Sequence, residues 1–332
     1  MRLESALAQY PREQLTRSPT PLDYLHNLSQ DLGFDLWLKR DDLTDLALGG
    51  DKPRKLEYEL AQAKLKEADV IVTCGSAQSN HARLTTAAAR KLGLDCTVVL
   101  SSDGNTELTG NLLATRLMGA DVRLLATQDH WALAEDVERI ARELQAQGRR
   151  PHIIPVSGTT PHSCLGYVRA GLELAKQFKE ADIEPTALYL PFGTGGIFSA
   201  LLLSLRQQGL DTPIIGISVN QSEGVCGEKL EHWWQSLCQL LDQDPQQPKG
   251  RFHISDGFIG KGYGDAPPAC LAAISEMASK EGILLDPVYS GKVFSALLAH
   301  KGRYQPQDKL VMLHSGGVPA LFAYQDILQN IC

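Results

Sequence analysis

The sequence predicts an α/β protein in which helices cover both faces of a mostly parallel sheet. Short apolar, β-rich runs alternate with segments of helical periodicity through the 332 residues, and this alternation is typical of parallel sheets flanked by helices. Several helical segments stop just before a glycine, which commonly ends a helix. The length allows about two domains.

The expected elements alternate along the chain. Strands are predicted at residues 69–73, 95–100, 121–125, 152–155, 187–191, 213–218 and 309–314. Helices between them are predicted at residues 54–66, 80–92, 110–118, 131–147, 166–178 and 197–207. Residues 230–250 are expected to be the end of a helix running into a polar loop, with Trp233 and Trp234 as packing anchors.

Composition excludes several classes of protein. A formal net charge of −7 argues against a dedicated nucleic-acid binder. The chain has no run of about 18 apolar residues, so no membrane span is expected, and its first residues lack the pattern of a signal peptide. The seven cysteines contain no C-x-x-C pair. We therefore expect a cytoplasmic enzyme with reduced thiols and no metal site.

Lys52 follows a glycine pair, Gly49-Gly50, and precedes a helix expected to begin near Pro53. Proline is tolerated in the first turn of a helix because its missing N–H would be unpaired there. A lysine held at its base and free at its tip suits an amine that forms and breaks a Schiff base. Taken alone, a surface lysine at a helix start is the better explanation of this pattern.

Two turns in the sequence have the character of anion sites. Ser79-Asn80-His81 follows a predicted strand and starts a helix, where free N–H groups and polar side chains can hold a carboxylate. Residues 193–197 form a glycine turn before another helix and suit a phosphate. The turn lacks the Gly-Lys-Ser/Thr of a Walker A loop and is an incomplete dinucleotide fingerprint, so a phosphate monoester is favoured. Helix capping and tight strand–helix packing remain the structural alternatives.

A third group of turns carries tyrosines and serines. Tyr289 and Ser290 follow Asp286-Pro287, with Tyr263 between two glycines upstream and residues 314–319 downstream. Such residues are often only turn formers.

Together these segments resemble the 1-aminocyclopropane-1-carboxylate deaminase/D-cysteine desulfhydrase family of pyridoxal-phosphate enzymes. The matching motifs occupy residues 39–44, 49–55, 78–81, 165–167, 286–289 and 316–321. They occur in family order across nearly the whole chain. The resemblance implies fold type II, the tryptophan-synthase-β-like fold, which has two domains, each with a mostly parallel sheet flanked by helices. It also implies pyridoxal 5'-phosphate as the cofactor.

The resemblance also implies a role for each motif. Lys52 matches the Schiff-base lysine, and the implied catalytic residues are Lys52, Ser79, Tyr263 and Tyr289. Substrate carboxylate binding is implied for Ser79, Asn80 and His81. Besides Lys52, the implied cofactor-binding residues are Asn80, the phosphate loop Gly193, Thr194, Gly195, Gly196 and Ile197, and Ser290 facing the pyridine nitrogen.

Two positions depart from the family pattern. Asp51 stands where relatives usually have Asn, which adds a negative charge beside Lys52. Ile197 stands where Thr is frequent, so one hydroxyl contact to the phosphate should be missing.

The resemblance further implies a larger domain of residues 1–50 and 160–332, with residues 51–159 inserted as a smaller domain. The active site is expected between them, and a homodimer is expected. The expected partner is a small amino-acid substrate, with no nucleic acid and no membrane.

A neutral Ser290 at the pyridine nitrogen favours β-elimination over ring opening, because a weaker electron sink still suffices when a good leaving group departs from Cβ. We therefore expect a D-cysteine desulfhydrase-like lyase that forms pyruvate, ammonia and hydrogen sulfide. The alternatives are a 1-aminocyclopropane-1-carboxylate deaminase, an L-cysteate sulfo-lyase, or a related amino-acid lyase or racemase.

Overall fold

Two sheets organise the molecule, which is a computed structural model describing residues 3–102, 107–127 and 129–329. The larger sheet has six strands in the order β1-β2-β10-β7-β8-β9, all parallel except β1. Its strands are β1 (Leu22–Tyr24), β2 (Asp35–Arg40), β7 (Ala187–Phe192), β8 (Ile214–Ser218), β9 (Phe252–Ser255) and β10 (Lys309–His314).

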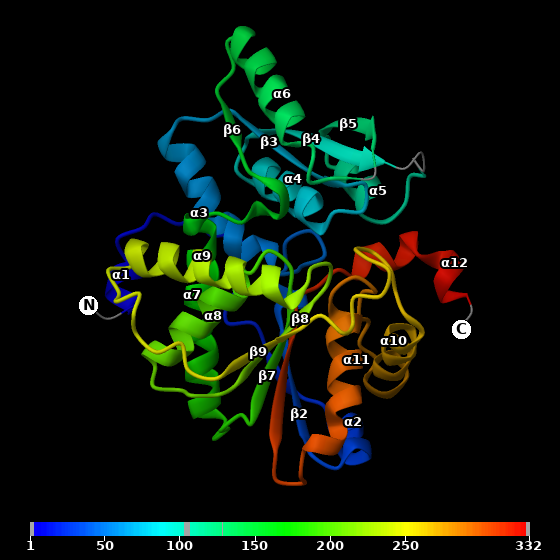
Figure 1. The fold of residues 1–332 in the computed structure, drawn as a ribbon. Helices are drawn as coiled ribbons and strands as arrows, with labels where there is room; N and C mark the ends of the chain where they lie inside the picture. The colour runs from blue at the N-terminus through cyan, green and yellow to red at the C-terminus, as the bar shows by residue number, and fades with distance from the viewer. Residues whose placement is uncertain (1–2, 103–106, 128, 330–332) are drawn as a thin grey trace.

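The smaller sheet, at the top of Figure 1, has four parallel strands in the order β5-β4-β3-β6. They are β3 (Val70–Ser76), β4 (Asp95–Ser102), β5 (Asp121–Ala126) and β6 (Pro151–Ile153). All four come from the chain between β2 and β7, so this sheet is inserted into the sequence of the larger one.

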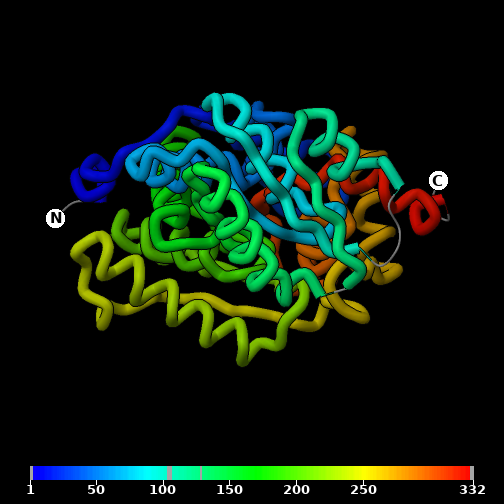
Figure 2. Tube along the Cα trace, turned by 90° about the horizontal axis from the view of Figure 1, so that it is seen from above, coloured from blue at the N-terminus to red at the C-terminus, as the bar shows by residue number. Residues whose placement is uncertain are grey.

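Helices cover both faces of each sheet. On the larger sheet, α7 (Pro161–Glu180), α8 (Gly196–Gln207) and α9 (Glu223–Leu240) pack on one face, and α2 (His26–Leu32), α10 (Pro268–Glu281) and α11 (Ser290–His300) on the other. On the smaller sheet, α3 (Lys52–Leu65), α4 (Asn80–Lys91) and α5 (Gly110–Leu117) share one core, and α6 (Ala134–Ala146) packs on the opposite face. The short helices α1 (Leu3–Leu7) and α12 (Gln325–Leu328) lie at opposite sides of the molecule in Figure 1, and Figure 2 shows the same from above.

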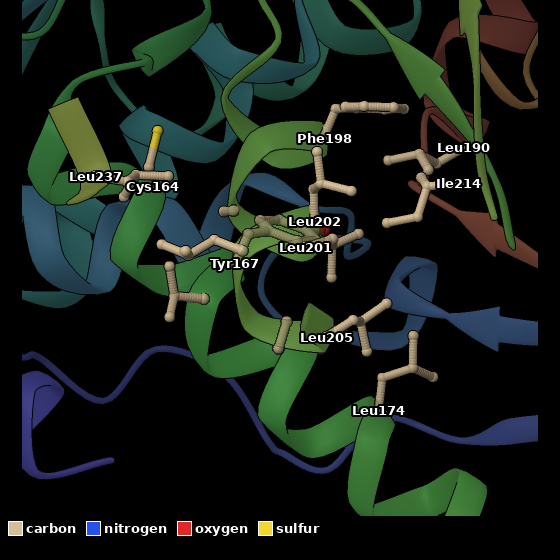
Figure 3. Close-up of a cluster of buried hydrophobic side chains, with 14 of the residues drawn as sticks. Cys164, Tyr167, Leu174, Leu190, Phe198, Leu201, Leu202, Leu205, Ile214 and Leu237 are labelled. Carbon is tan, nitrogen blue, oxygen red and sulfur yellow. The ribbon is translucent and has the colours of Figure 1, made fainter. Parts of the chain in front are cut away.

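The core of the larger domain consists of two clusters, because successive side chains of a strand point to opposite faces of the sheet. On β7, Leu188 and Leu190 join the cluster under α7, α8 and α9, whereas Ala187 and Tyr189 join the cluster under α2, α10 and α11. Figure 3 shows Leu190 among the buried side chains of the first cluster. Both faces are apolar because helices bury both, as parallel sheets require.

Helices α3 and α7 join the two domains and pack closely against each other. A Cβ at Gly166 of α7 would lie 2.0 Å from the carbonyl oxygen of Arg54 in α3. Only glycine fits this crossing, which explains the glycine in the motif at residues 165–167.

A buried ionic network fixes the same crossing. Arg54 donates to Asp41 Oδ1 at 2.9 Å and to Glu173 Oε1 at 2.8 Å. Lys39 on β2 donates to Glu173 at 2.5 Å, and the Tyr167 hydroxyl donates to Asp41 Oδ2 at 2.7 Å. The network therefore joins β2, α3 and α7. Its central residue, Arg54, is two residues after Lys52.

The seven predicted strands are confirmed, with ends that differ by a few residues, while β1, β2 and β9 were not predicted. β2 ends in Lys39 and Arg40, and charged residues do not indicate a strand. Lys39 is nevertheless buried, because Glu173, far away in the sequence, pairs with it.

The predicted helices are also present, but two of them, α7 and α6, begin at other residues than predicted. α7 begins at Pro161 because Thr160 caps it: the Thr160 hydroxyl accepts from the Ser163 N–H, and the Ser163 hydroxyl accepts from the Thr160 N–H. α6 begins at Ala134, and Trp131 lies in the preceding turn. Both tryptophans of α9 are packing residues as predicted: Trp234 is fully buried, and Trp233 packs partly buried against the same cluster. The helix ends at Leu240, before the polar loop.

Within the described ranges, no helix has the length and apolar character to cross a membrane. The six cysteines in these ranges are buried free thiols.

Candidate active site

One pocket collects residues from both sheets where their parallel strands end. Gly75 and Ser76 come from the end of β3, Gly193 follows β7, Val219 follows β8, and Ser315 follows β10. The carboxyl ends of parallel strands are the usual place for ligands in α/β proteins.

Lys52 lies in this pocket as the first residue of α3, with its Nζ 2.6 Å from Asp51 Oδ2. The side chain of Lys52 is 12% exposed and that of Asp51 6%. The chain reaches the helix through a loop in which Asp45, Ala47 and Leu48 have positive φ. Such backbone costs free energy and persists only where the surroundings hold it.

Buried Arg83 on α4 holds that loop. Its guanidinium donates to the carbonyl oxygen of Ala47, and to that of Gly49 at 3.1 Å. It also donates to Asn111 Oδ1 at 2.7 Å. Lys52 is thus held from two sides: Arg83 binds the loop before it, and Arg54, two residues after it, binds Asp41 and Glu173.

The start of α4 forms one side of the pocket. Ser79 is the N-cap, and its hydroxyl accepts from the Ala82 N–H at 3.1 Å. Asn80 Oδ1 accepts from Asn111 Nδ2 at 2.8 Å. This contact fixes the amide so that Asn80 Nδ2 keeps its donors for a ligand. The first N–H groups of α4, those of Asn80 and His81, have no intrahelical acceptor.

Both ring nitrogens of His81 are occupied inside the protein. Thr73 donates its hydroxyl proton to the Ile154 carbonyl oxygen at 2.8 Å, so His81 Nε2 must donate to Thr73 Oγ1, also at 2.8 Å. His81 Nδ1 then accepts from Thr85 at 3.2 Å. Burial, with nearby lysine ammonium groups, holds the pKa of His81 well below its usual range. A neutral ring with both nitrogens bonded cannot pair with a carboxylate, so only its backbone N–H suits that role.

The glycine turn lies where α8 begins. Gly195 has φ +89°, and a Cβ there would lie 2.9 Å from the Phe192 ring. Gly193, Thr194, Gly195 and Ile197 line the pocket. Gly196 does not, because it packs toward Thr159 and Cys164. The free N–H groups of the helix start suit an anion.

A side-chain relay supports this turn. Lys55 Nζ donates to Thr159 Oγ1 at 2.7 Å, and Thr159 Oγ1 lies 2.6 Å from Thr194 Oγ1. Trp233 Nε1 donates to the Thr194 carbonyl oxygen at 2.8 Å. Burial, followed by the charge of Lys52, lowers the pKa of Lys55 to about 7. The anion's charge would favour the protonated form of this amine.

The two tyrosines meet in the pocket, with their hydroxyl oxygens 2.9 Å apart. Burial, with Tyr263 next to it, raises the pKa of Tyr289 well above its usual range. Tyr289 therefore stays protonated near neutral pH and can act as an acid. His130, from the segment before α6, packs on the Tyr263 ring with centroids 4.9 Å apart.

The structure does not bring Ser290 into the pocket. Ser290 is fully buried, and its hydroxyl donates to Asp286 Oδ1 at 2.6 Å and accepts from the Asp286 N–H at 2.8 Å. Ser315 lines the pocket instead. From the sequence, residues 314–319 are expected only as a turn near the tyrosines, and no role is predicted for Ser315. Sequence reasoning also missed Lys55, Thr159 and Trp233, whose contacts run between distant segments.

The pocket fits a phosphate-bearing aldehyde cofactor. An amine lies in it at Lys52, and a glycine cradle with Lys55 behind it provides for a phosphate. Among the residues that the structure describes, no group of three or more His, Cys, Asp or Glu side chains could hold a metal ion.

Comparison with known proteins agrees with this arrangement. A family model described as pyridoxal-phosphate dependent enzyme matches residues 14–316. A putative 1-aminocyclopropane-1-carboxylate deaminase of Pyrococcus horikoshii is 39% identical, covering 98% of this chain and 97% of its own. A D-cysteine desulfhydrase of Serratia proteamaculans is 37% identical, covering 98% and 99%.

A crystal structure described as an ACC deaminase homologue superposes with a TM-score of 0.91 at 36% identity, over 100% of this chain and 99% of that one. The fold is thus fold type II, and the cofactor is pyridoxal phosphate. The chain belongs to the pyridoxal-phosphate-dependent enzymes, in the family whose members are named 1-aminocyclopropane-1-carboxylate deaminase and D-cysteine desulfhydrase.

Proposed function

We propose that the protein is a D-cysteine desulfhydrase-like lyase that carries out β-elimination. The observation that supports this is the character of the pocket: of the described residues that line it, only Asp51 is a carboxylate. Asp51 is already paired with Lys52. A neutral group is therefore left to face the pyridine nitrogen, which makes the cofactor a weaker electron sink. Elimination of a good leaving group tolerates that better than ring opening does.

We assign the pyridine nitrogen to Ser315 in place of Ser290. Ser315 follows β10 in the middle of the larger sheet, and no partner for its hydroxyl occurs among the described residues. Its turn is held by His314, whose Nδ1 accepts from the Gly316 N–H at 3.2 Å. Ser315, like Ser290, is a neutral hydroxyl, so β-elimination is still favoured.

Pyridoxal phosphate, when bound, supplies the carbonyl carbon that captures the substrate amine and a ring that withdraws electrons from Cα. The glycine turn, with Thr194 and Lys55, would hold its phosphate. The N-terminus of α4, with Ser79 as N-cap, would hold the substrate carboxylate. Lys52 would take the proton from Cα as general base. Asp51, 2.6 Å from Lys52 Nζ, would orient this amine and accept a hydrogen bond from it.

The C–S bond then breaks, and its electron pair leaves with sulfur. Tyr289, kept protonated by burial, would donate a proton to the departing sulfur with Tyr263 as its hydrogen-bond partner. The overall balance is D-cysteine plus water giving pyruvate, ammonia and hydrogen sulfide. The D configuration is supported by the relatives named D-cysteine desulfhydrase.

A panel of substrates tests the proposal. D-cysteine, L-cysteine, β-chloroalanine, L-cysteate and 1-aminocyclopropane-1-carboxylate are compared at equal enzyme concentration, with 2-oxo acid, ammonia and sulfide measured. We expect the largest kcat/KM for D-cysteine, with equal amounts of pyruvate and sulfide. A larger kcat/KM for 1-aminocyclopropane-1-carboxylate, with 2-oxobutanoate as the product, would contradict the assignment and favour the deaminase.

Tyr289→Phe tests the proton donor. We expect kcat for D-cysteine to fall by about 10²–10³-fold, because general acid catalysis typically contributes that much. β-Chloroalanine should be affected less, since chloride needs no proton to leave. Tyr24→Phe is the control, because Tyr24 is an exposed tyrosine on β1. An equal loss with both substrates would mean that Tyr289 does not serve the leaving group.

The larger-scale organisation is also proposed. The membership of the two sheets supports a larger domain of residues 1–50 and 160–332 and a smaller domain of residues 51–159, with the site between them. A homodimer and a cytoplasmic location remain predictions. Sedimentation of the purified enzyme would test the first, and cell fractionation the second.

A further inference from the structure

A buried lysine lies behind the tyrosine side of the pocket. Lys292 on α11 is fully buried, and its Nζ donates to three backbone carbonyl oxygens. The distances are 2.7 Å to Ile259, 3.3 Å to Val219 and 3.4 Å to Gly262.

No carboxylate pairs directly with this ammonium in the described parts of the chain. The Asp286 carboxylate is already used by the N–H groups of Val288, Tyr289 and Ser290 and by the Ser290 hydroxyl. Burying a charge without such a partner costs free energy, and here three carbonyl dipoles offset that cost. Lys292 therefore acts as a cation enclosed by carbonyl oxygens.

Two of the three carbonyl groups connect Lys292 to the wall of the pocket. Val219 lines the pocket at the end of β8, and Gly262 directly precedes Tyr263. Lys292 itself stands three residues after Tyr289, which is the N-cap of α11. One ammonium group thus joins the end of β8, the segment at residues 259–263 and the helix that begins after Tyr289.

We propose that Lys292 is a positioning residue, an internal cation that holds the Tyr263 segment so that the Tyr263 hydroxyl meets that of Tyr289. The inference rests on the proposed role of these tyrosines. Tyr263 lies in a segment rich in glycine and is itself 36% exposed. Its side chain is held by the Tyr289 hydroxyl and the His130 ring. Its backbone is held through the Gly262 carbonyl, which accepts from Lys292 Nζ at 3.4 Å and from the Asp265 N–H at 3.3 Å.

The inference is tested by removing the Lys292 ammonium and supplying a free monovalent cation in its place. Lys292→Ala leaves a space surrounded by carbonyl oxygens, the ligands that K⁺ takes in proteins. NH₄⁺ resembles K⁺ in size, and Li⁺ is much smaller. The variant is measured in LiCl, KCl and NH₄Cl at equal ionic strength. The control is Lys261→Ala, because Lys261 is an exposed lysine in the same segment.

In LiCl we expect kcat of Lys292→Ala to fall about 10²-fold with KM little changed, since a misplaced catalytic group has an effect of this size. In KCl or NH₄Cl, kcat of Lys292→Ala should be at least about tenfold higher than in LiCl. The cofactor-free variant should also melt at a higher temperature in KCl than in LiCl. Wild type and Lys261→Ala should respond to none of these salts.

The melting comparison needs neither substrate nor cofactor, so it separates this inference from the D-cysteine proposal. The kinetic comparison uses whichever substrate of the panel turns over fastest. A Lys292→Ala enzyme as active as Lys261→Ala would overturn the inference. So would a loss of activity that KCl, NH₄Cl and LiCl leave equal, because the lysine would then only fill space.

If Lys292→Ala does not fold, Lys292→Met decides the question. Methionine keeps the apolar stem and removes the charge. A fall in kcat of at least about tenfold, with the visible absorbance of the bound cofactor unchanged, supports the inference. An unchanged kcat overturns it.

Discussion

Lys52→Ala is expected to lower turnover by at least about 10⁴-fold, because it removes both the covalent attachment of the cofactor and the general base. The visible absorbance of the lysine-bound cofactor should disappear as well. Lys52 is the amine paired with Asp51 where the two domains meet, at the first residue of α3. Lys55 cannot replace it, since its Nζ is engaged with Ser157 and Thr159.

Spectra and single-turnover kinetics of the purified variant measure both effects. Lys66→Ala is the matched control, because Lys66 is an exposed lysine at the C-terminal end of the same helix. This control should keep full absorbance and turnover. A Lys52→Ala protein that retained the absorbance through a covalent link to another lysine would show that the assignment of Lys52 is wrong.

Arg54→Met should destabilise the protein by about 3–5 kcal/mol, the range observed when one partner of a buried ion pair is removed. The side chain of Arg54 is 3% exposed, and its partners Asp41 and Glu173 are 0% and 12% exposed. Methionine would leave Asp41 buried with its nearest cation gone. Urea unfolding of the cofactor-free protein measures the change.

Arg123→Met provides the comparison, since Arg123 pairs with Asp121 and Glu143 at the surface. Its loss should cost no more than about 1 kcal/mol. Equal effects of the two substitutions would contradict the role given to the buried network. If Arg54→Met does not fold, Tyr167→Phe removes one donor to Asp41 and should cost about 1.5–3 kcal/mol.

The features predicted correctly from the sequence are those decided by neighbouring residues. A glycine turn before a helix leaves free N–H groups wherever it occurs, and Gly195 does lie at the start of α8 as predicted; the anion site there stays a prediction. Ser79 is a helix cap because of its position relative to Ala82. Strand and helix alternation is likewise a local pattern, and it predicted the fold class.

Predictions that depended on distant partners were less reliable. The His81 ring is occupied by Thr73 and Thr85, and the decisive proton is fixed by the Ile154 carbonyl, far away in the sequence. Ser290 is the exception, because its hydroxyl is occupied by Asp286, a partner only four residues away. β2 escaped recognition because its Lys39 is neutralised by Glu173.

The sequence by itself determined the fold class and placed Lys52 and the two proposed anion sites at helix starts, because turn and helix chemistry is local. Only the tertiary structure decided which serine enters the pocket, that Lys55 and Thr159 support the phosphate turn, and that Lys292 lies behind Tyr263. Each of these depends on burial and on hydrogen bonds, most of them to partners from other segments. Such partners meet only when the chain is folded, and a side chain with its bonds already filled is not available to a ligand.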